Sequence, residues 1–167
     1  MLRSFSRDHV EEFAAAMTVA YVWAQKRGRF YPHIADLTLD EFIESQAAPN
    51  KKQIGVLNDG QMCALVTVWL VGDGVYDVHA IGPRKAKPGP LLAALLQIRD
   101  SLFQSQNADA VTTWCGIYRG HKNSGILRIV DACGMRAIGE PIPYAEGAPV
   151  LIQKYEITRQ DYERAKN

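Results

Sequence analysis

The middle of the chain constrains the fold most, because it reads as three strands joined by two tight turns. Apolar and β-branched residues fill 53–57, 61–71 and 75–81. Between them stand Asn58-Asp59-Gly60 and Gly72-Asp73-Gly74, whose residue types tolerate the positive φ of hairpin turns. We therefore predict an antiparallel meander in this part of the chain.

A long amphipathic helix is predicted before the meander. Apolar residues recur at helical spacing from Val10 to Ala24, and Gly28 stands where such a helix would end. Asp8 followed by Glu11 matches the capping box that opens a helix.

A second capping-box pattern follows, formed by Thr38 and Glu41. It predicts a short helix that ends near Gln46. A short strand is predicted at the very start of the chain, over residues 2–6.

After the meander, helices and strands alternate. A basic loop rich in glycine and proline covers residues 82–90 and leads into a helix that reaches Phe103. Pro90 suits the first helical position, where a missing N–H costs nothing. We predict strands at 110–117, 136–139 and 150–157, a helix at 124–133, an irregular loop at 141–149, and a polar tail that can be helical. The order predicts one α/β domain over residues 1–167, with a mixed sheet covered by helices and a β-α-β crossover.

Composition excludes several classes of protein. The chain has 167 residues, 47% of them apolar, which is enough for one core. A net charge of +1 does not indicate nucleic acid as a partner. Residues 1–6 lack the apolar segment of a signal peptide, and no apolar run is long enough to span a membrane.

The cysteines and histidines do not form a site by their spacing. Three cysteines at distant positions argue against disulfides and zinc and favour a reducing compartment, so we expect a cytoplasmic protein. Cys115 and Cys133 have no base nearby in sequence, so we interpret them as packed thiols. His9 and His33 have no ligand-like spacing, so no metal is predicted.

The element order and one motif resemble the GCN5-related N-acetyltransferases (GNAT). In that family an Asn is often followed, eleven residues later, by Gly and an apolar or aromatic residue. Asn123 and Gly134-Met135 stand at this spacing, with Ile126 and Ile129 at apolar positions between them. The resemblance covers nearly the whole chain and implies the GNAT fold, acetyl-CoA as cosubstrate and an amine as acceptor.

Two positions depart from the family pattern. The family's pyrophosphate loop has an Arg or Gln followed by spaced glycines, where this chain has Pro83, Ala86 and Pro88. A one-residue slip places Arg84 and Gly89 in part of that pattern. The family's Tyr that protonates the departing thiolate is replaced here by Val130. These departures put catalysis in question and leave a second hypothesis open, a binding protein without activity on the same fold.

The chain also resembles small acetyltransferase-like proteins of tailed bacteriophages, including an internal virion protein. The resemblance rests on a lysine-rich loop, on Gln97-Ile98-Arg99-Asp100 and on residues 123–128. It implies a place in the host cytoplasm or in the virion.

The basic loop is the predicted coenzyme site. Arg84, Lys85 and Lys87 precede a helix, whose first N–H groups and dipole favour phosphate. The alternative is a solvated loop, and its prolines offer no N–H. By resemblance, the residues expected to bind acetyl-CoA are Ala80, Ile81, Arg84, Lys85, Ala86, Lys87, Gly89 and Asn123.

The last strand of the meander carries the predicted base. Alternation puts Asp77 and His79 on one face of residues 75–81. The family often places there the group that deprotonates the amine, and an imidazole needs less tuning for this than a carboxylate does. The alternative is an ordinary polar pair on a wet sheet face. Tyr118, in the predicted loop before the helix at 124, is a candidate proton donor in place of Val130.

Overall fold

The computed structural model describes residues 1–28, 31–83, 88–118, 120–122 and 124–166. Its first part consists of β1 (Leu2–Phe5), α1 (Val10–Gln25), α2 (Pro32–Ala35), α3 (Leu39–Gln46), β2 (Lys51–Asn58), β3 (Gln61–Gly72) and β4 (Val75–Ile81). Its second part consists of α4 (Pro88–Ser105), β5 (Ala110–Tyr118), β6 (His121–Lys122), α5 (Ser124–Ala132), β7 (Arg136–Pro143), β8 (Val150–Thr158) and α6 (Arg159–Arg164). No helix among the described residues is long and apolar enough to cross a membrane.

One mixed sheet organises the chain, with the strand order β1-β2-β3-β4-β5-β8-β7 and the short β6 beside β5. All neighbours are antiparallel except β4 and β5, which are parallel. The predicted meander is confirmed as β2-β3-β4. The crossover through α4 links the two parallel strands, as expected for a β-α-β unit.

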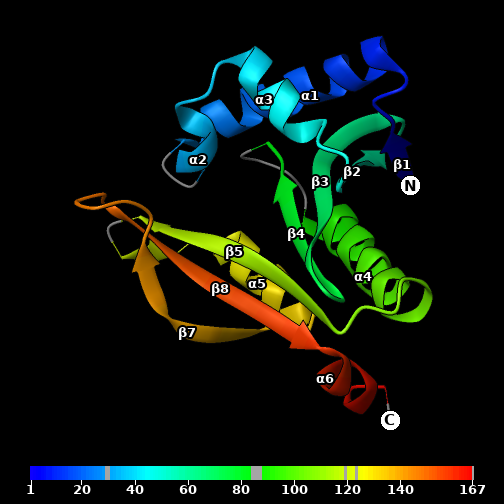
Figure 1. The fold of residues 1–167 in the computed structure, drawn as a ribbon, viewed down its shortest axis with the longest axis vertical. Coiled ribbons are helices and arrows are strands. Elements are labelled where there is room, and N and C mark those ends of the chain that lie inside the picture. Colours follow the sequence, from blue (N-terminus) through cyan, green and yellow to red (C-terminus); the bar gives the residue numbers. More distant parts are fainter. Residues whose placement is uncertain (29–30, 84–87, 119, 123, 167) are drawn as a thin grey trace.

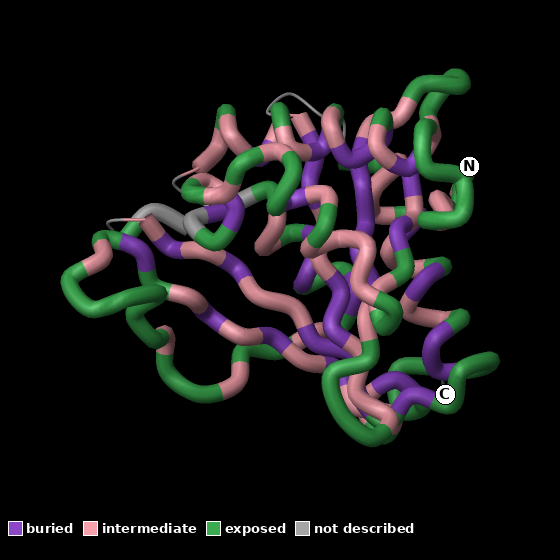
Figure 2. Tube along the Cα trace, turned by 45° about the horizontal axis from the view of Figure 1, so that its top comes forward, coloured by how far each residue is buried: buried purple, intermediate pink, exposed green. Residues whose placement is uncertain are grey.

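Helices cover both faces of the first four strands (Figure 1). On one face, α1, α2 and α3 pack on a cluster that includes Phe42 and Leu65. On the other, α4 packs through Ile98 and Phe103 on Val66 and its neighbours. Strand β3 is therefore buried over five consecutive residues, Ala64–Val68, as expected for a strand covered on both sides (Figure 2).

The second part of the sheet is covered on one face. There α5 packs through Val130 on Cys115 and Tyr155. Strand β8 alternates buried and half-buried residues over much of its length, and β7 has no buried residue.

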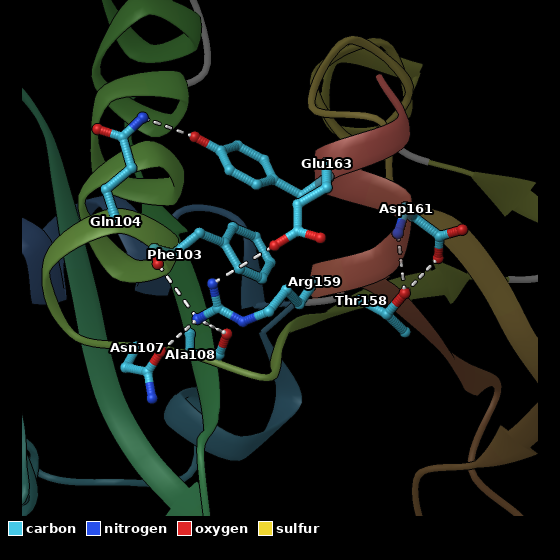
Figure 3. Close-up of polar contacts among 9 residues, drawn as sticks. Phe103, Gln104, Asn107, Ala108, Thr158, Arg159, Asp161 and Glu163 are labelled. Carbon is cyan, nitrogen blue, oxygen red and sulfur yellow. Dashed lines mark hydrogen bonds and ion pairs between the residues drawn. The ribbon is translucent and has the colours of Figure 1, made fainter. Parts of the chain in front are cut away.

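The C-terminal helix joins this second part to α4. Thr158 caps α6 by accepting a hydrogen bond from the Asp161 N–H, and Tyr162 stacks on Phe103 with ring centroids 4.5 Å apart. Arg159 reaches back to the C-terminal end of α4 and donates to the carbonyls of Phe103 and Ala108 (Figure 3). These contacts satisfy carbonyls that a helix end leaves without partners.

Three predictions about elements need correction. The capping box of Thr38 and Glu41 is confirmed, but Asp8 with Glu11 does not form one. His9 is the cap residue of α1 and makes no side-chain cap bond, while Asp8 bonds locally with Ser6. The Asp8 carboxylate therefore bonds within a local turn and does not cap the helix as the pattern predicted.

The other two corrections concern helix α4 and strand β7. Helix α4 starts at Pro88 instead of Pro90; Pro90 still falls within the first turn, where its N–H would have had no helical partner. Strand β7 continues to Pro143, where a loop was predicted, because the irregularity near Gly139, at φ +64°, lets pairing with β8 resume at Ile142.

Candidate active site

The two parallel strands β4 and β5 separate after a short contact. They pair only at Val75 with Ala110, Tyr76 with Val111 and Asp77 with Thr112. Beyond these pairs β5 stays with β8 up to Tyr118, while β4 stays with β3 up to Ile81. This parallel pair confirms the β-α-β crossover that the element order predicted.

A pocket of about 410 Å³ lies where these strands part. The edges of both strands line it, including Val78 and Ala80 of β4 and Thr113 and Gly116 of β5. Because β5 pairs with β4 only as far as Thr112, the rest of this β4 edge has no strand partner on the pocket side among the residues that the structure describes. Such an edge presents backbone hydrogen-bond donors and acceptors to a ligand that enters the pocket.

The pocket wall differs between the two faces of the sheet. On the face of α4 and α5 it is mainly apolar, from Leu91, Leu95, Ile98, Ile126, Ile129 and Val130. On the face of α2 and α3 it is aromatic and polar, from Tyr31, His33, Gln46, Lys51, Thr67, Trp69, Asp77, His79 and Trp114. One wall therefore suits an apolar chain and the other suits polar chemistry.

Asp77 holds the two strands together at the point where they part. Its side chain is buried and accepts hydrogen bonds from Thr112 Oγ1 at 2.9 Å and from Trp114 Nε1 at 3.1 Å. Both donors come from β5. Each carboxylate oxygen of Asp77 thus accepts a hydrogen bond from the neighbouring strand β5. Such bonds stabilise a carboxylate that is buried.

His79 lies next to this carboxylate on the same face. Its Nε2 is 3.6 Å from Asp77 Oδ2, beyond ordinary hydrogen-bond distance, and has no hydrogen-bond partner among the described residues. Its ring lies 4.9 Å from that of Trp69 and 6.2 Å, edge-on, from that of His33. The imidazole is therefore held by rings and has a nitrogen still available for a hydrogen bond.

Titration of the surrounding groups is shifted by burial. Desolvation in the pocket wall, with smaller effects of His79 and Lys51, lowers the pKa of His33 to about 4. Burial raises the pKa of Tyr31, partly opposed by the Arg27 guanidinium. Tyr31 is thus a neutral phenol, and it donates to the carbonyl of Ala80 at 3.2 Å. His33 is neutral at physiological pH.

A cluster of hydrogen-bonded polar side chains lies at the polar wall of the pocket. Thr67 Oγ1 donates to Gln53 Oε1 at 2.8 Å, and Gln53 Nε2 donates to the carbonyl and the side-chain oxygen of Gln46. Thr67 and Gln53 are buried. Lys51 Nζ donates to the carbonyl of Ser45 at 2.8 Å, and desolvation lowers its pKa.

The structure brings only some of the predicted site residues together. Asp77, His79, Ala80 and Ile81 all line the pocket. Gly89 is exposed in the first turn of α4 and does not line it. Tyr118 ends β5, where a loop was predicted, and is also absent from the pocket wall. Arg84, Lys85, Ala86, Lys87 and Asn123 lie outside the described residues.

The cysteines are free thiols, and two are buried as expected. Burial raises the pKa of Cys115 to about 12 and also raises that of Cys133. A thiol in such surroundings stays protonated and is a poor nucleophile. Across the described ranges, no group of three or more His, Cys, Asp or Glu side chains is arranged to hold a metal ion.

Several pocket residues escaped the sequence analysis, among them Gln46, Lys51, Thr67 and Trp114. Each lies on an element other than β4, and strand pairing or helix packing brings it to the pocket. Strand alternation gives the face of Thr67 or Trp114 within its own strand. It does not give the neighbouring strand or its register.

Solved structures with a similar fold are acetyltransferases. A spermidine N-acetyltransferase from Vibrio cholerae, in complex with CoA and spermine, has a TM-score of 0.74 at 12% identity, over 98% of this chain and 97% of that chain. The aminoglycoside acetyltransferase AAC(6')-Ib, in complex with coenzyme A, has a TM-score of 0.71 at 15% identity, over 100% and 99%. A GNAT-family acetyltransferase from Bacillus anthracis has a TM-score of 0.70 at 14% identity, over 95% and 94%.

No family model and no curated protein matches this sequence. The resemblance to bacteriophage proteins stays a prediction. Structural similarity at identities of 10–15% carries the fold and leaves the activity to be argued from the site. On that ground the chain has the fold of the GCN5-related N-acetyltransferases, a mixed sheet flanked by helices.

Proposed function

We propose that the protein is an N-acetyltransferase that moves an acetyl group from acetyl-CoA to an amine. The observation that carries this proposal is the pocket between the separated ends of β4 and β5, with an apolar wall on one face and the Asp77–His79 pair on the other. Acetyl-CoA supplies the reactive thioester, and the chain's own residues position the two reactants.

The apolar side of the pocket fits the arm of a coenzyme. Leu91, Leu95 and Ile98 of α4 line the pocket, and within the described part of the chain the β4 edge next to them has no strand partner beyond Asp77. Amide groups of an extended arm can bond to such an edge, much as an added strand does. The N–H groups around Ala80 and Ile81 are the candidates to polarise the thioester carbonyl.

His79 is the proposed base. An amine must lose a proton to attack a thioester, and His79 Nε2 has no hydrogen-bond partner among the described residues. Asp77 is a positioning residue, because Thr112 and Trp114 occupy its oxygens and its negative charge faces the imidazole at 3.6 Å. Val130 provides no proton for the leaving thiolate, which can leave unprotonated because an ordinary thiol is acidic enough, with a pKa of about 8.5.

The first test is binding. A ligand that binds only the folded state must stabilise it, so acetyl-CoA at a hundred times its Kd should add about 2.7 kcal/mol and raise Tm. Reversing charge in the predicted phosphate loop, Arg84→Glu with Lys87→Glu, should weaken this binding and leave the Tm of the free protein nearly unchanged. Absence of any shift at millimolar acetyl-CoA would contradict the proposal.

The second test is turnover, measured as thiol release with a panel of amines. His79→Gln should lower turnover while acetyl-CoA affinity stays the same. His9→Gln is the matched control, because His9 is exposed at the start of α1. Full activity in His79→Gln would assign the proton transfer to water or to the acceptor itself.

The alternative is a binding protein without activity, such as a virion-associated module of a phage. Val130 and the prolines of the predicted coenzyme loop favour it. It predicts a Tm shift with acetyl-CoA but no thiol release with any amine. The three free thiols fit a reducing compartment, so we propose the cytoplasm for the enzyme, and the host cytoplasm or the virion for the alternative.

A further inference from the structure

A row of side chains crosses three strands on the polar side of the pocket. Strand register sets Lys51 of β2 opposite Trp69 of β3, and Trp69 opposite Asp77 of β4. Directly opposed residues project from the same face of a sheet. Thr67 and His79 form the next pair along the same face. All five residues line one pocket.

An aromatic ring stands between a cation and the imidazole in this row. Lys51 Nζ lies 5.5 Å from the ring centroid of Trp69, and the ring centroid of His79 lies 4.9 Å from that of Trp69. A ligand that spans from His79 to Lys51 must therefore pass over Trp69. The row offers a site for an amine, a flat apolar surface and a positive charge, in that order.

The fixed charges on this wall favour an anion at the Lys51 end. Asp77 is the one carboxylate among the described residues that line the pocket, and its two oxygens already accept from Thr112 and Trp114. Lys51 has no ion pair with any residue in the described ranges, and its Nζ donates to a single carbonyl, that of Ser45. The neutral His33 beside it adds no charge.

The same charged groups disfavour an acceptor that carries several positive charges. Spermine, or an aminoglycoside, brings several ammonium groups, and the described wall has no second carboxylate to receive one. A second ammonium near Lys51 would be repelled in a partly desolvated site. The charges on the polar wall of this chain therefore do not favour a polycationic amine.

We infer that the acceptor is a primary amine whose carboxylate lies beyond an apolar or aromatic spacer, as in an ω-amino acid. This inference rests on the proposed acetyl transfer. The amine lies at His79, the apolar group against Trp69 and the carboxylate at Lys51. In the step, the amine nitrogen forms a bond to the acetyl carbon, the carbon–sulfur bond breaks, the proton passes to His79, and the thiolate leaves on coenzyme A.

The experiment is a calorimetric titration of three probes in the presence of coenzyme A. The ω-amino acid 4-(2-aminoethyl)benzoate and phenethylamine differ only in the carboxylate, and spermidine is the polycation. The aminoethylbenzoate should bind at least tenfold more tightly than phenethylamine, and spermidine most weakly. Lys51→Met should make the affinities of the first two probes similar by weakening the aminoethylbenzoate alone, and Lys51→Arg should keep the preference.

Lys52→Met is the matched control, because Lys52 is the next residue of β2 and points to the opposite face. It should keep the preference of the wild type. Lys51 also bonds to a carbonyl at the end of α3, so the Tm of each variant is measured first. A preference lost in Lys51→Met and kept in Lys51→Arg identifies the charge and not the packing as the cause.

Equal affinity for 4-(2-aminoethyl)benzoate and phenethylamine, tighter binding of spermidine, or no binding of any probe would overturn the inference. Thiol release on the same samples separates the two proposals. Discriminating binding without acetyl transfer refutes the proposed function alone. Acetyl transfer to spermidine at an equal or higher rate than to the aminoethylbenzoate refutes the acceptor class alone.

Discussion

The two halves of the sheet are packed differently, and the pocket lies where they meet. In the first half β3 has a core on each face, one under α1, α2 and α3 and the other under α4. In the second half β5 and β8 have α5 on one face, and β7 has no buried residue. The first half can therefore keep its shape through its own core. The second half depends on its contacts with the first, and those contacts also set the width of the pocket between β4 and β5.

Several contacts cross the seam between the halves, the line along which β4 meets β5. Val111, Ile157 and Tyr162 of the second half belong to the core cluster under α4. Three residue pairs join β4 to β5, and Asp77 bonds to two side chains of β5. Gly74 accepts from the backbone of Asp109 at 2.7 Å, and Arg159 ties the end of β8 to α4. If this comparison is right, changes at these positions will loosen the second half and leave the first half folded.

The largest effect is expected at Asp77. In Asp77→Ala the buried donors of Thr112 and Trp114 lose their acceptor, which should cost about 3 kcal/mol of unfolding free energy. Urea unfolding measures the loss, and hydrogen exchange should locate it in β5 and β8 before β2 and β3. Asp73→Ala, at an exposed turn of the same hairpin, should change stability by less than about 0.5 kcal/mol. Equal losses in the two variants would mean that Asp77 does not hold the seam.

Arg159→Ala should cost about 2 kcal/mol, because the guanidinium donates to two carbonyls and to Asn107 at the end of α4. Figure 3 shows these contacts converging on one nitrogen of the side chain. Arg164→Ala is the control, since its 3.9 Å ion pair with Asp161 is exposed and should contribute little. Acetyl-CoA binding should survive in both, and its loss in Arg159→Ala would show that this tie also shapes the pocket.

Two glycines separate backbone strain from contact across the seam. Gly74 and Gly60 both have positive φ, at +66° and +77°. A Cβ on Gly74 would meet the carboxylate of Asp109, whereas nothing lies within 4 Å of a Cβ on Gly60. Gly60→Ala should cost about 1 kcal/mol and Gly74→Ala about 1.5 kcal/mol, measured by thermal unfolding. A larger loss in Gly60→Ala would assign the whole effect to the backbone.

The last prediction concerns His33 and the dependence of stability on pH. Its pKa is lowered to about 4, so the folded state binds fewer protons than the unfolded state between pH 4 and 6.5. Stability should therefore rise with pH through this window and level off above it. His33→Gln should reduce that slope, as measured by urea midpoints at four pH values. An unchanged slope would mean that other groups carry the pH dependence; His9→Gln is the control.

Much of the fold could be predicted because local sequence patterns, such as turn residues and strand alternation, determine it. The turns at 58–60 and 72–74 and the alternation of residues 75–81 fix three strands, and β4 has the predicted bounds. The errors came where two local interactions compete. Asp8 bonds to Ser6 instead of capping α1, and Gly139 carries β7 through an irregularity that reads as the end of a strand.

The candidate site also has one part that the sequence predicts and another that only the tertiary structure sets. Sequence alone determined that Asp77 and His79 share a face, because side chains along a strand alternate with a period of two. Tertiary structure decided that Thr112 and Trp114 occupy Asp77, that His79 keeps a nitrogen available, and that Lys51 and Trp69 stand in the same row. Those placements depend on which strands pair and in what register. Register is set by the burial of whole faces across the sheet, which no single segment encodes.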